Sequence, residues 1–244
     1  MNKEITDFKK KCYNNYLSDI NRELKIFPEP YLFPDGNPIQ PVLPLAKEPC
    51  EVMLIGAFPS ARFEQREKAG LVPIGNNLSP FAEEHYFDGR QVRNQESRKQ
   101  LEDNYFPKLG IDPKTIWITD LVRVYLYPDP HVNNCQKLYP TKEFINTHKH
   151  FKKIAHSQSN MKWIIEEIKL CSPSLIITLG EVPAKAFTKS IRDNEELLNG
   201  EIRTIQLDKE YRISHLPHPE IGRRDGAWKS RTHNSLRRLK KEMT

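Results

Sequence analysis

Four short apolar segments, each ending at a turn or a polar residue, constrain the fold of this chain more than any other feature. Helical stretches lie between them, notably residues 143–170, whose apolar side chains recur about every 3.6 positions. Buried strands that alternate with helices indicate an α/β fold. We therefore predict a three-layer α/β/α sandwich with a central, mostly parallel sheet of about four strands. The four segments are residues 50–58, 115–126, 173–187 and 211–220.

The first 49 residues differ in pattern from the rest of the chain. Residues 4–26 carry apolar side chains at near-helical spacing, which predicts a helix. Residues 27–49 contain seven prolines, and proline fixes φ and removes a backbone donor, so this segment is expected to be extended. We predict one domain over residues 1–244, in which the helix and the Pro-rich strap (1–49) pack on the core (50–244).

Composition limits the expected location and cofactors. No apolar run approaches the roughly 20 residues that a membrane span needs, and residues 1–17 lack the apolar segment of a signal peptide. We expect a cytoplasmic monomer without membrane contact. The four cysteines are scattered, whereas zinc and iron–sulfur sites usually use closely spaced pairs. Ordinary reduced cysteines are favoured, and no metal or other cofactor is expected.

The basic residues gather near the carboxyl end of the chain. Residues 222–241 hold eight Lys or Arg and one acidic residue, whereas the formal net charge of the whole chain is +6. A cluster of this kind is typical of a surface that binds the phosphates of nucleic acid. A solvated basic helix would give the same pattern, and both interpretations stay open.

Polar or conformationally special residues stand where the predicted strands end. Residues 56–59 form a Gly-x-x-Pro turn, Asp120 interrupts an apolar run, and the third and fourth segments end near Gly180 and His218. In parallel sheets, ligands bind outside the carboxyl ends of the strands. A carboxylate inside an apolar strand must be paired, hydrogen-bonded or exposed at the strand end. Each feature alone is compatible with an ordinary turn, but all of them fall at the edge where a site is expected.

The order of these features along the chain resembles that of the uracil-DNA glycosylase superfamily. The resemblance spans roughly residues 50–241 and depends on dispersed motifs. Residues 72–75, "VPIG", are similar to a Val-Pro-Phe-Gly stretch of the single-strand-selective uracil glycosylases. Residues 218–239 are similar to the His-Pro-Ser loop of the superfamily and the helix that follows it. The chain is therefore identified as a divergent member.

The resemblance implies a DNA glycosylase that flips a damaged or modified base out of single- or double-stranded DNA and hydrolyses its N-glycosidic bond, as in base-excision DNA repair. A role against foreign, modified DNA is equally compatible. His218 matches the histidine that stabilises the departing base. No lysine nucleophile stands at a motif position, so a monofunctional enzyme is expected. The residues expected to contact the base are Gly56, Ala57, Phe58, Asp120 and Phe81, with Phe63 as the alternative stacking ring.

Phe58 is the first departure from the superfamily pattern. In the best-known members, the residue before the motif proline is an Asp or Asn that positions water, and a phenyl ring cannot do this. Asn76 and Asn77 are the candidates for that role, with an ordinary Asn-Asn turn as the alternative. Glu64 is a further polar group nearby. An enzyme that depends on leaving-group stabilisation and a member without catalytic activity both remain compatible with the sequence.

Asp120 is the second departure, because the uracil enzymes generally carry Asn there. An amide offers both a donor and an acceptor, whereas an ionised carboxylate only accepts. Unless it is protonated, Asp120 would face a repulsive uracil oxygen. The hypothesis from the sequence is that the substrate is not plain uracil but a purine lesion or a base that bears an amino group.

Glu220 is the third departure, because the superfamily loop usually has Ser there and a carboxylate would repel a phosphate. Arg223 and Arg224 are expected to compensate as phosphate contacts, and Ile221 is a candidate wedge for the vacated stack, with a surface side chain as the alternative. The full set of predicted DNA contacts is Ser60, Arg62, Gly180, Pro219, Ile221, Arg223, Arg224, Lys229 and Arg231.

Two rival hypotheses belong to other functional classes. The first is a superfamily fold that binds a nucleobase or nucleic acid without cleaving it, which Phe58 and Glu220 favour. The second is an unrelated α/β nucleotide-binding enzyme. Neither a Gly-x-x-x-x-Gly-Lys-Ser/Thr nor a Gly-x-Gly-x-x-Gly phosphate cradle occurs in the chain, which argues against the second. An iron–sulfur cluster is not expected, because Cys12 has no neighbouring cysteine.

Overall fold

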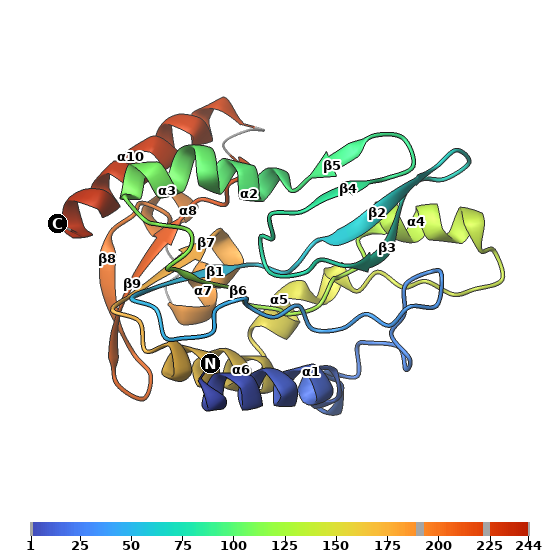
Figure 1. Ribbon diagram of the computed structural model, residues 1–244, viewed down its shortest axis with the longest axis horizontal. Coiled ribbons are helices and arrows are strands. Elements are labelled where there is room, and N and C mark those ends of the chain that lie inside the picture. Colours follow the sequence, from blue (N-terminus) through green and yellow to red (C-terminus); the bar gives the residue numbers. More distant parts are fainter. Residues whose placement is uncertain (1, 189–192, 222–224, 244) are drawn as a thin grey trace.

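A five-stranded sheet forms the centre of the protein, whose computed structural model describes residues 2–188, 193–221 and 225–243. The strand order is β6-β1-β7-β9-β8 (Figure 1). The first four strands run parallel, and β8 pairs antiparallel with β9. The predicted mostly parallel α/β sheet is confirmed, with β8 as an additional edge strand. The strands are β6 Trp117–Asp120, β1 Val52–Gly56, β7 Leu175–Leu179, β9 Glu210–Leu216 and β8 Ile202–Gln206.

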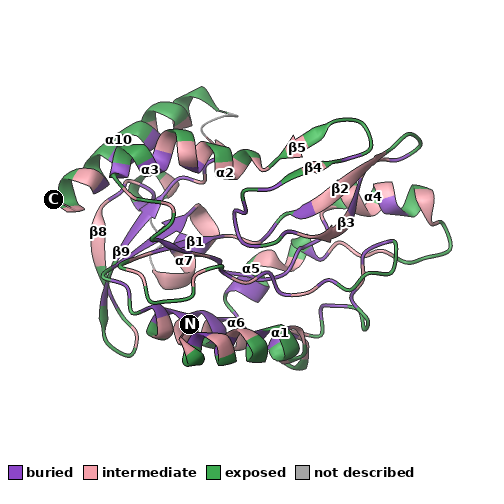
Figure 2. Cartoon of the chain, in the orientation of Figure 1, coloured by how far each residue is buried: buried purple, intermediate pink, exposed green. Residues whose placement is uncertain are grey.

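Helices cover both faces of the sheet (Figure 1). Alternate residues of β1 face opposite sides, because successive side chains of a strand point to opposite faces. Met53 and Ile55 belong to a core with residues of α1 and α6, whereas Leu54 belongs to a second core with residues of α3 and α10. Figure 2 shows the strands of the sheet largely buried and the outer faces of α1 and α10 exposed. The three predicted layers are therefore present.

The helix bounds follow local capping signals. α1 begins after Asn2, whose side chain accepts hydrogen bonds from the backbone N–H groups of Glu4 and Ile5. The predicted helix over 143–170 is divided, because Ser157 is extended and caps a new helix, and residues 143–147 are not helical. The helices are α1 Lys3–Leu24, α2 Glu96–Gln100, η1 Leu101–Tyr105, α3 Phe106–Leu109, α4 Asp129–Leu138, η2 His148–His150, α5 Phe151–Ala155, α6 Gln158–Cys171, α7 Glu181–Phe187, α8 Asn194–Leu197 and α10 Gly226–Met243.

The Pro-rich strap lies against the core without forming a helix or a strand of the sheet. The backbone N–H of Val42 donates to the carbonyl of Arg123 at 2.7 Å, and Lys9 of α1 donates to the carbonyl of Ala46 at 2.7 Å. Phe33 and Ile39 are buried in the same core as α1. The strap therefore runs beside the end of β6. That the whole chain is one domain stays a prediction.

Two hairpins follow β1 and were not predicted from the sequence. β2 (Ala61–Arg66) pairs with β3 (Gly70–Asn76), and β4 (His85–Phe87) pairs with β5 (Val92–Asn94). Figure 1 shows both hairpins extending away from the central sheet, with α4 beside β3. Within the described ranges, no helix is long and apolar enough to cross a membrane.

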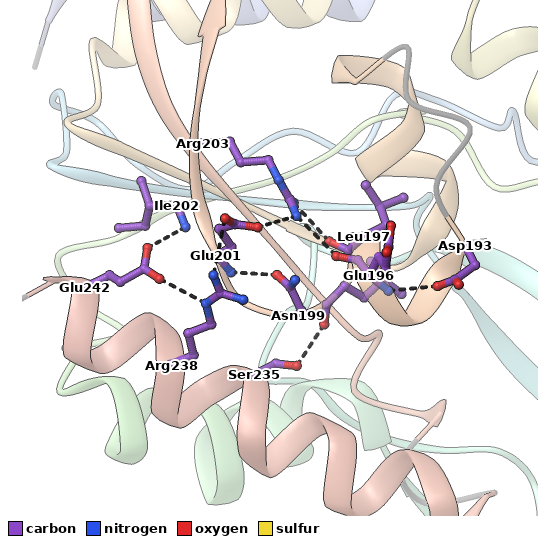
Figure 3. Close-up of polar contacts among 11 residues, drawn as sticks. Asp193, Glu196, Leu197, Asn199, Glu201, Ile202, Arg203, Ser235, Arg238 and Glu242 are labelled. Atoms are coloured by element: carbon purple, nitrogen blue, oxygen red, sulfur yellow. Dashed lines mark hydrogen bonds and ion pairs between the residues drawn. The ribbon is translucent and has the colours of Figure 1, made fainter.

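α10, the basic C-terminal helix, is tied to the segment before β8 (Figure 3). The Ser235 hydroxyl donates to the carbonyl of Leu198 at 2.8 Å. Arg238 lies 3.0 Å from a carboxylate oxygen of Glu242 and 3.2 Å from one of Glu201, and Glu242 accepts the backbone N–H of Ile202 at 2.7 Å. Part of the basic charge of this helix therefore serves the fold.

Candidate functional site

A cavity of about 880 Å³ opens at the carboxyl ends of the parallel strands. β1 and β6 end in register, with Gly56 opposite Asp120, and His218 follows the end of β9 by two residues. The cavity therefore lies where the sequence predicted a site. Its wall includes these predicted residues: Ala57, Phe58, Ser60, Asn77, Phe81, Asp120 and His218.

Gly56 lets two predicted base-contacting groups approach the backbone closely. A Cβ atom at Gly56 would overlap both Asp120 Oδ1 and the Phe81 ring. Phe81 itself has a φ of 49°, a left-handed conformation that is uncommon for a residue with a side chain. The strand end, the carboxyl group and the phenyl ring therefore meet at one point, and any larger residue at position 56 would separate them.

Asp120 is 2% exposed, and its Oδ1 has no hydrogen-bond partner among the described residues. Burial raises the pKa of Asp120 from 3.8 to about 8, Arg123 opposes the shift, and Glu167 adds to it. The carboxyl group is therefore largely protonated at neutral pH. A protonated carboxyl group offers a donor and an acceptor, as an amide does. The sequence argument against plain uracil assumed an ionised carboxylate, and the burial removes that assumption.

The two candidate asparagines have different environments. Asn77 is 7% exposed and lines the cavity, and its Nδ2 has no partner within the described ranges. Asn76 is the last residue of β3; its side chain donates to the carbonyl of Pro38 at 3.3 Å and accepts the N–H of Gln40 at 3.4 Å. Asn76 is not part of the cavity wall. It links the hairpin to the strap, and Asn77 remains as the catalytic candidate.

His218 has its ring oriented by its own loop. The backbone N–H of Glu220 donates to His218 Nδ1 at 3.3 Å, which places the proton of the neutral ring on Nε2. The ring centroids of His218 and Phe81 lie 6.3 Å apart. Gly180 has a φ of 90°, and a Cβ there would lie 3.4 Å from the Cβ of His218. His218 can therefore donate a hydrogen bond through Nε2 near the Phe81 ring.

Phe58 forms part of an aromatic wall. Its ring packs edge-on against Phe151 at 4.9 Å and against His148 at 5.3 Å between centroids. This packing is a structural reason for an apolar side chain before Pro59. Phe58 therefore contributes shape to the cavity and no group that could bind or activate water.

A family model for the Uracil DNA glycosylase superfamily matches residues 44–233, which is most of the chain. The chain belongs to the uracil-DNA glycosylase superfamily. The match includes β1, β6, β7 and β9, and with them every predicted residue of the cavity wall. A comparison with curated proteins found no significant match.

The DNA contacts predicted from the superfamily resemblance divide into several groups. Ser60 is exposed at the cavity. Arg62 lies 2.7 Å from the buried carboxylate of Glu84, and Arg231 lies 2.5 Å from Glu195 and packs over Trp228. Both arginines therefore have structural partners, which the sequence did not indicate.

Two further predicted contacts lie beside His218. Gly180 packs against it, and Ile221 donates its backbone N–H to the carbonyl of His218. Arg223 and Arg224 lie outside the described residues.

Pro219 and Lys229 line a second groove, between α10 and the segment from α2 to α3. Lys108 and His233 lie in the same groove, so it presents basic groups beside the loop that carries His218. The backbone of a nucleic acid is the class of ligand that such a surface attracts. Two of the predicted DNA contacts, Pro219 and Lys229, therefore share this groove.

Metal chemistry has no candidate ligand set in the described ranges. No group of three His, Cys, Asp or Glu residues is placed to hold a metal ion there, and Cys12, Cys50, Cys135 and Cys171 are not in disulfides. The expectation that this protein uses no cofactor stays a prediction.

Several residues of the cavity wall were missed by the sequence analysis. They come from the two hairpins, the residue before α2, the segment after β6, α4 and η2. Apart from β3, which contains residues 72–75, these elements carry no motif of the superfamily. Gln95 is one of them, and its Oε1 is buried without a partner in the described part of the chain. No local signal distinguished these residues, because their proximity results from the tertiary structure. They are Leu71, Tyr86, Gln95, Tyr125, His131 and His148.

Proposed function

We propose that the protein is a monofunctional DNA glycosylase that flips a damaged or modified base into the cavity and hydrolyses its N-glycosidic bond. The observation that carries the proposal is the meeting of Asp120, Asn77, Phe81 and His218 in one cavity at the strand ends. Membership of the uracil-DNA glycosylase superfamily supports this class of reaction.

Each residue of the proposed site has a role that follows from its chemistry. The Phe81 ring stacks on the base, and the protonated Asp120 carboxyl group hydrogen-bonds its Watson–Crick edge as donor and acceptor. As the C1′–N bond breaks, its electron pair moves to the base, and His218 Nε2 donates a hydrogen bond to the base oxygen that becomes negative. A donor of this kind contributes about 3–4 kcal/mol to transition-state stabilisation.

Water completes the proposed reaction by adding to C1′ of the sugar, and the departing base gains a proton. Phe58 cannot position this water, so Asn77 is the residue proposed for it. The reaction then depends mainly on stabilisation of the leaving base. No lysine occurs among the described residues of the cavity wall, which supports hydrolysis without a covalent imine on the enzyme.

A catalytically inactive member that binds a nucleobase or nucleic acid is the second candidate function. Two observations favour it. Phe58 is fixed in an aromatic wall, and the carboxylate of Glu220 lines the cavity beside His218, where it would repel a phosphate.

The test uses single- and double-stranded oligonucleotides that each carry one candidate base: uracil, hypoxanthine, xanthine or a modified cytosine. Alkaline cleavage reports abasic sites. We expect cleavage of at least one substrate, with a loss of about 10²–10³-fold in the single-turnover rate of His218→Ala and no loss of DNA binding. Binding without cleavage of any base would support the inactive member instead.

A further inference from the structure

The cavity continues well beyond the groups that would hold one base. Its volume of about 880 Å³ falls in the upper part of the range of roughly 300–1,000 Å³ that encloses drug-sized ligands, and a single base is much smaller. Asp120, Phe81 and His218 form one side. The other side, here called the aromatic compartment, consists of Phe63, Leu71, Tyr125, Leu126 and His131.

The aromatic compartment is built as a fixed wall. The ring centroids of Phe63 and His131 lie 4.8 Å apart, and the Tyr125 hydroxyl lies 2.5 Å from His131 Nδ1. The backbone of Phe63 donates to the Tyr86 hydroxyl at 3.1 Å, and Asn134 donates to the carbonyl of Leu71 at 2.8 Å. These contacts hold the hairpin β2–β3 against α4. The side chains of the compartment therefore do not move together and fill the space beside the base site.

The charges around the compartment select an uncharged occupant. Burial lowers the pKa of His131 and raises that of Tyr125 well above its ordinary value, so both rings are neutral at physiological pH. The carboxylate of Glu96 belongs to the same cavity wall. Two other charged side chains of that wall are paired, Glu84 with Arg62 and Arg93 with Asp88. An anionic group would therefore meet repulsion and a desolvation cost, whereas an uncharged group would pack on the rings.

We propose that the substrate is a base that carries a bulky, uncharged substituent on its major-groove edge and that this substituent occupies the aromatic compartment. The proposal rests on the proposed function, because Asp120 is taken to engage the Watson–Crick edge and His218 a carbonyl oxygen of the base. The edge that remains is the one that carries the methyl group of thymine. A substituent there leaves base pairing intact, so such a base can exist in duplex DNA before it is flipped.

The test compares oligonucleotides with one pyrimidine whose C5 carries hydrogen, methyl, a benzyl group, a hexose-bearing hydroxymethyl group, or a carboxylate-bearing group of similar size. Single-turnover cleavage is measured on each, and binding is measured with cleavage-resistant 2′-fluoro versions. We expect at least one bulky, uncharged substituent to raise the cleavage rate and affinity over C5-hydrogen by about tenfold or more, the scale of discrimination in apolar pockets. The benzyl and hexose arms distinguish an apolar from a sugar-type substituent.

Leu71→Trp, which fills the compartment, should reduce the ratio of bulky to unsubstituted substrate toward one. Leu45→Trp is the matched control at an exposed leucine outside this cavity and should keep the ratio. Equal or faster cleavage of the C5-hydrogen substrate overturns the substituent proposal and leaves the glycosylase proposal standing. Tighter binding of bulky analogues without any cleavage would support the substituent proposal and overturn the glycosylase proposal. Because the substrate series stands alone, it decides the question even if Leu71→Trp does not fold.

Discussion

The carboxyl group of Asp120 shows how burial at a single residue determines what a site can bind. Beneath it, Arg123 and Glu167 form a fully buried ion pair at 2.5 Å, which Thr119 and Trp117 join through hydrogen bonds. Desolvation is the largest influence on the pKa of Asp120 and raises it, whereas Arg123 lowers this pKa and Glu167 raises it. The residue type alone suggested an anion, whereas its environment provides a neutral acid.

The first prediction concerns the pH dependence of base binding. Because the pKa of Asp120 is raised to about 8, its O–H donor is present below that pH and is lost as the pH rises through it. Affinity for a base with a donor-and-acceptor edge should therefore fall above about pH 8 in the wild type. In Asp120→Asn, which cannot ionise, this loss should disappear. Binding of a cleavage-resistant uracil analogue across this range is the measurement, and identical profiles for both proteins would contradict the prediction.

Gly56→Ala should strongly reduce base excision while the fold persists. The new methyl group would overlap Asp120 Oδ1 and the Phe81 ring, so both would have to move, at a cost of about 1–3 kcal/mol in stability. We expect a loss of cleavage of about 100-fold or more, since misplacement by about 1 Å can cost this much. Gly75→Ala is the control, because a Cβ there meets nothing within 4 Å. A thermal melt with a cleavage assay separates the two effects, and similar activity of both variants would argue against this geometry.

Sequence patterns located the site residues that stand at or just after the ends of the parallel strands. Gly56, Asp120 and His218 follow recognisable strands, so their order along the chain was sufficient to place them at one edge. The roles of Asn76 and Arg231 could not be predicted, because their partners, Pro38 and Glu195, lie far away in the chain and no local pattern links them.

At the scale of elements, the strands that could be predicted from the sequence differ in burial from those that could not. β1 and β7 are almost fully buried, so each gives a continuous apolar run. β8 and the two hairpins are half-exposed and mix polar with apolar residues, so their period was not distinctive. The hairpin β2–β3 also contributes Phe63 and Leu71 to the aromatic compartment, and no local sequence pattern showed that these residues meet Tyr125, Leu126 and His131.

The contact between α10 and the turn before β8 is the element-scale feature most sensitive to one methyl group. Gly200 has a φ of 77°, and a Cβ there would overlap the backbone carbonyl of Ser235 in α10. Gly200→Ala should therefore lower the free energy of unfolding by about 2–4 kcal/mol, from backbone strain and overpacking. Gly36→Ala isolates the strain, because Gly36 has a φ of 95° and no atom within 4 Å. Denaturant unfolding measures both, and equal losses would show that the close approach of Gly200 to the Ser235 carbonyl does not fix the helix.

At the scale of the molecule, the net charge of +6 is less informative than where its basic groups lie. Arg231 and Arg238 of α10 form ion pairs with Glu195, Glu201 and Glu242. Lys229 instead lines the groove that also holds Pro219, next to the loop of His218. The basic cluster in the sequence therefore combines fold-stabilising pairs with a surface that faces the proposed path of DNA.

The salt dependence of DNA binding should separate these two kinds of basic residue. Each phosphate contact contributes about 0.9 to the slope of log affinity against log salt for duplex DNA. Lys229→Gln should therefore weaken binding and reduce the slope by about one contact, irrespective of sequence. Arg238→Gln removes the same charge from an ion-paired position and should leave the slope unchanged, although it lowers stability. Affinities at several salt concentrations, on one unmodified duplex, give both slopes. Equal slopes for the two variants would mean that overall charge, rather than the groove beside His218, governs the association with DNA.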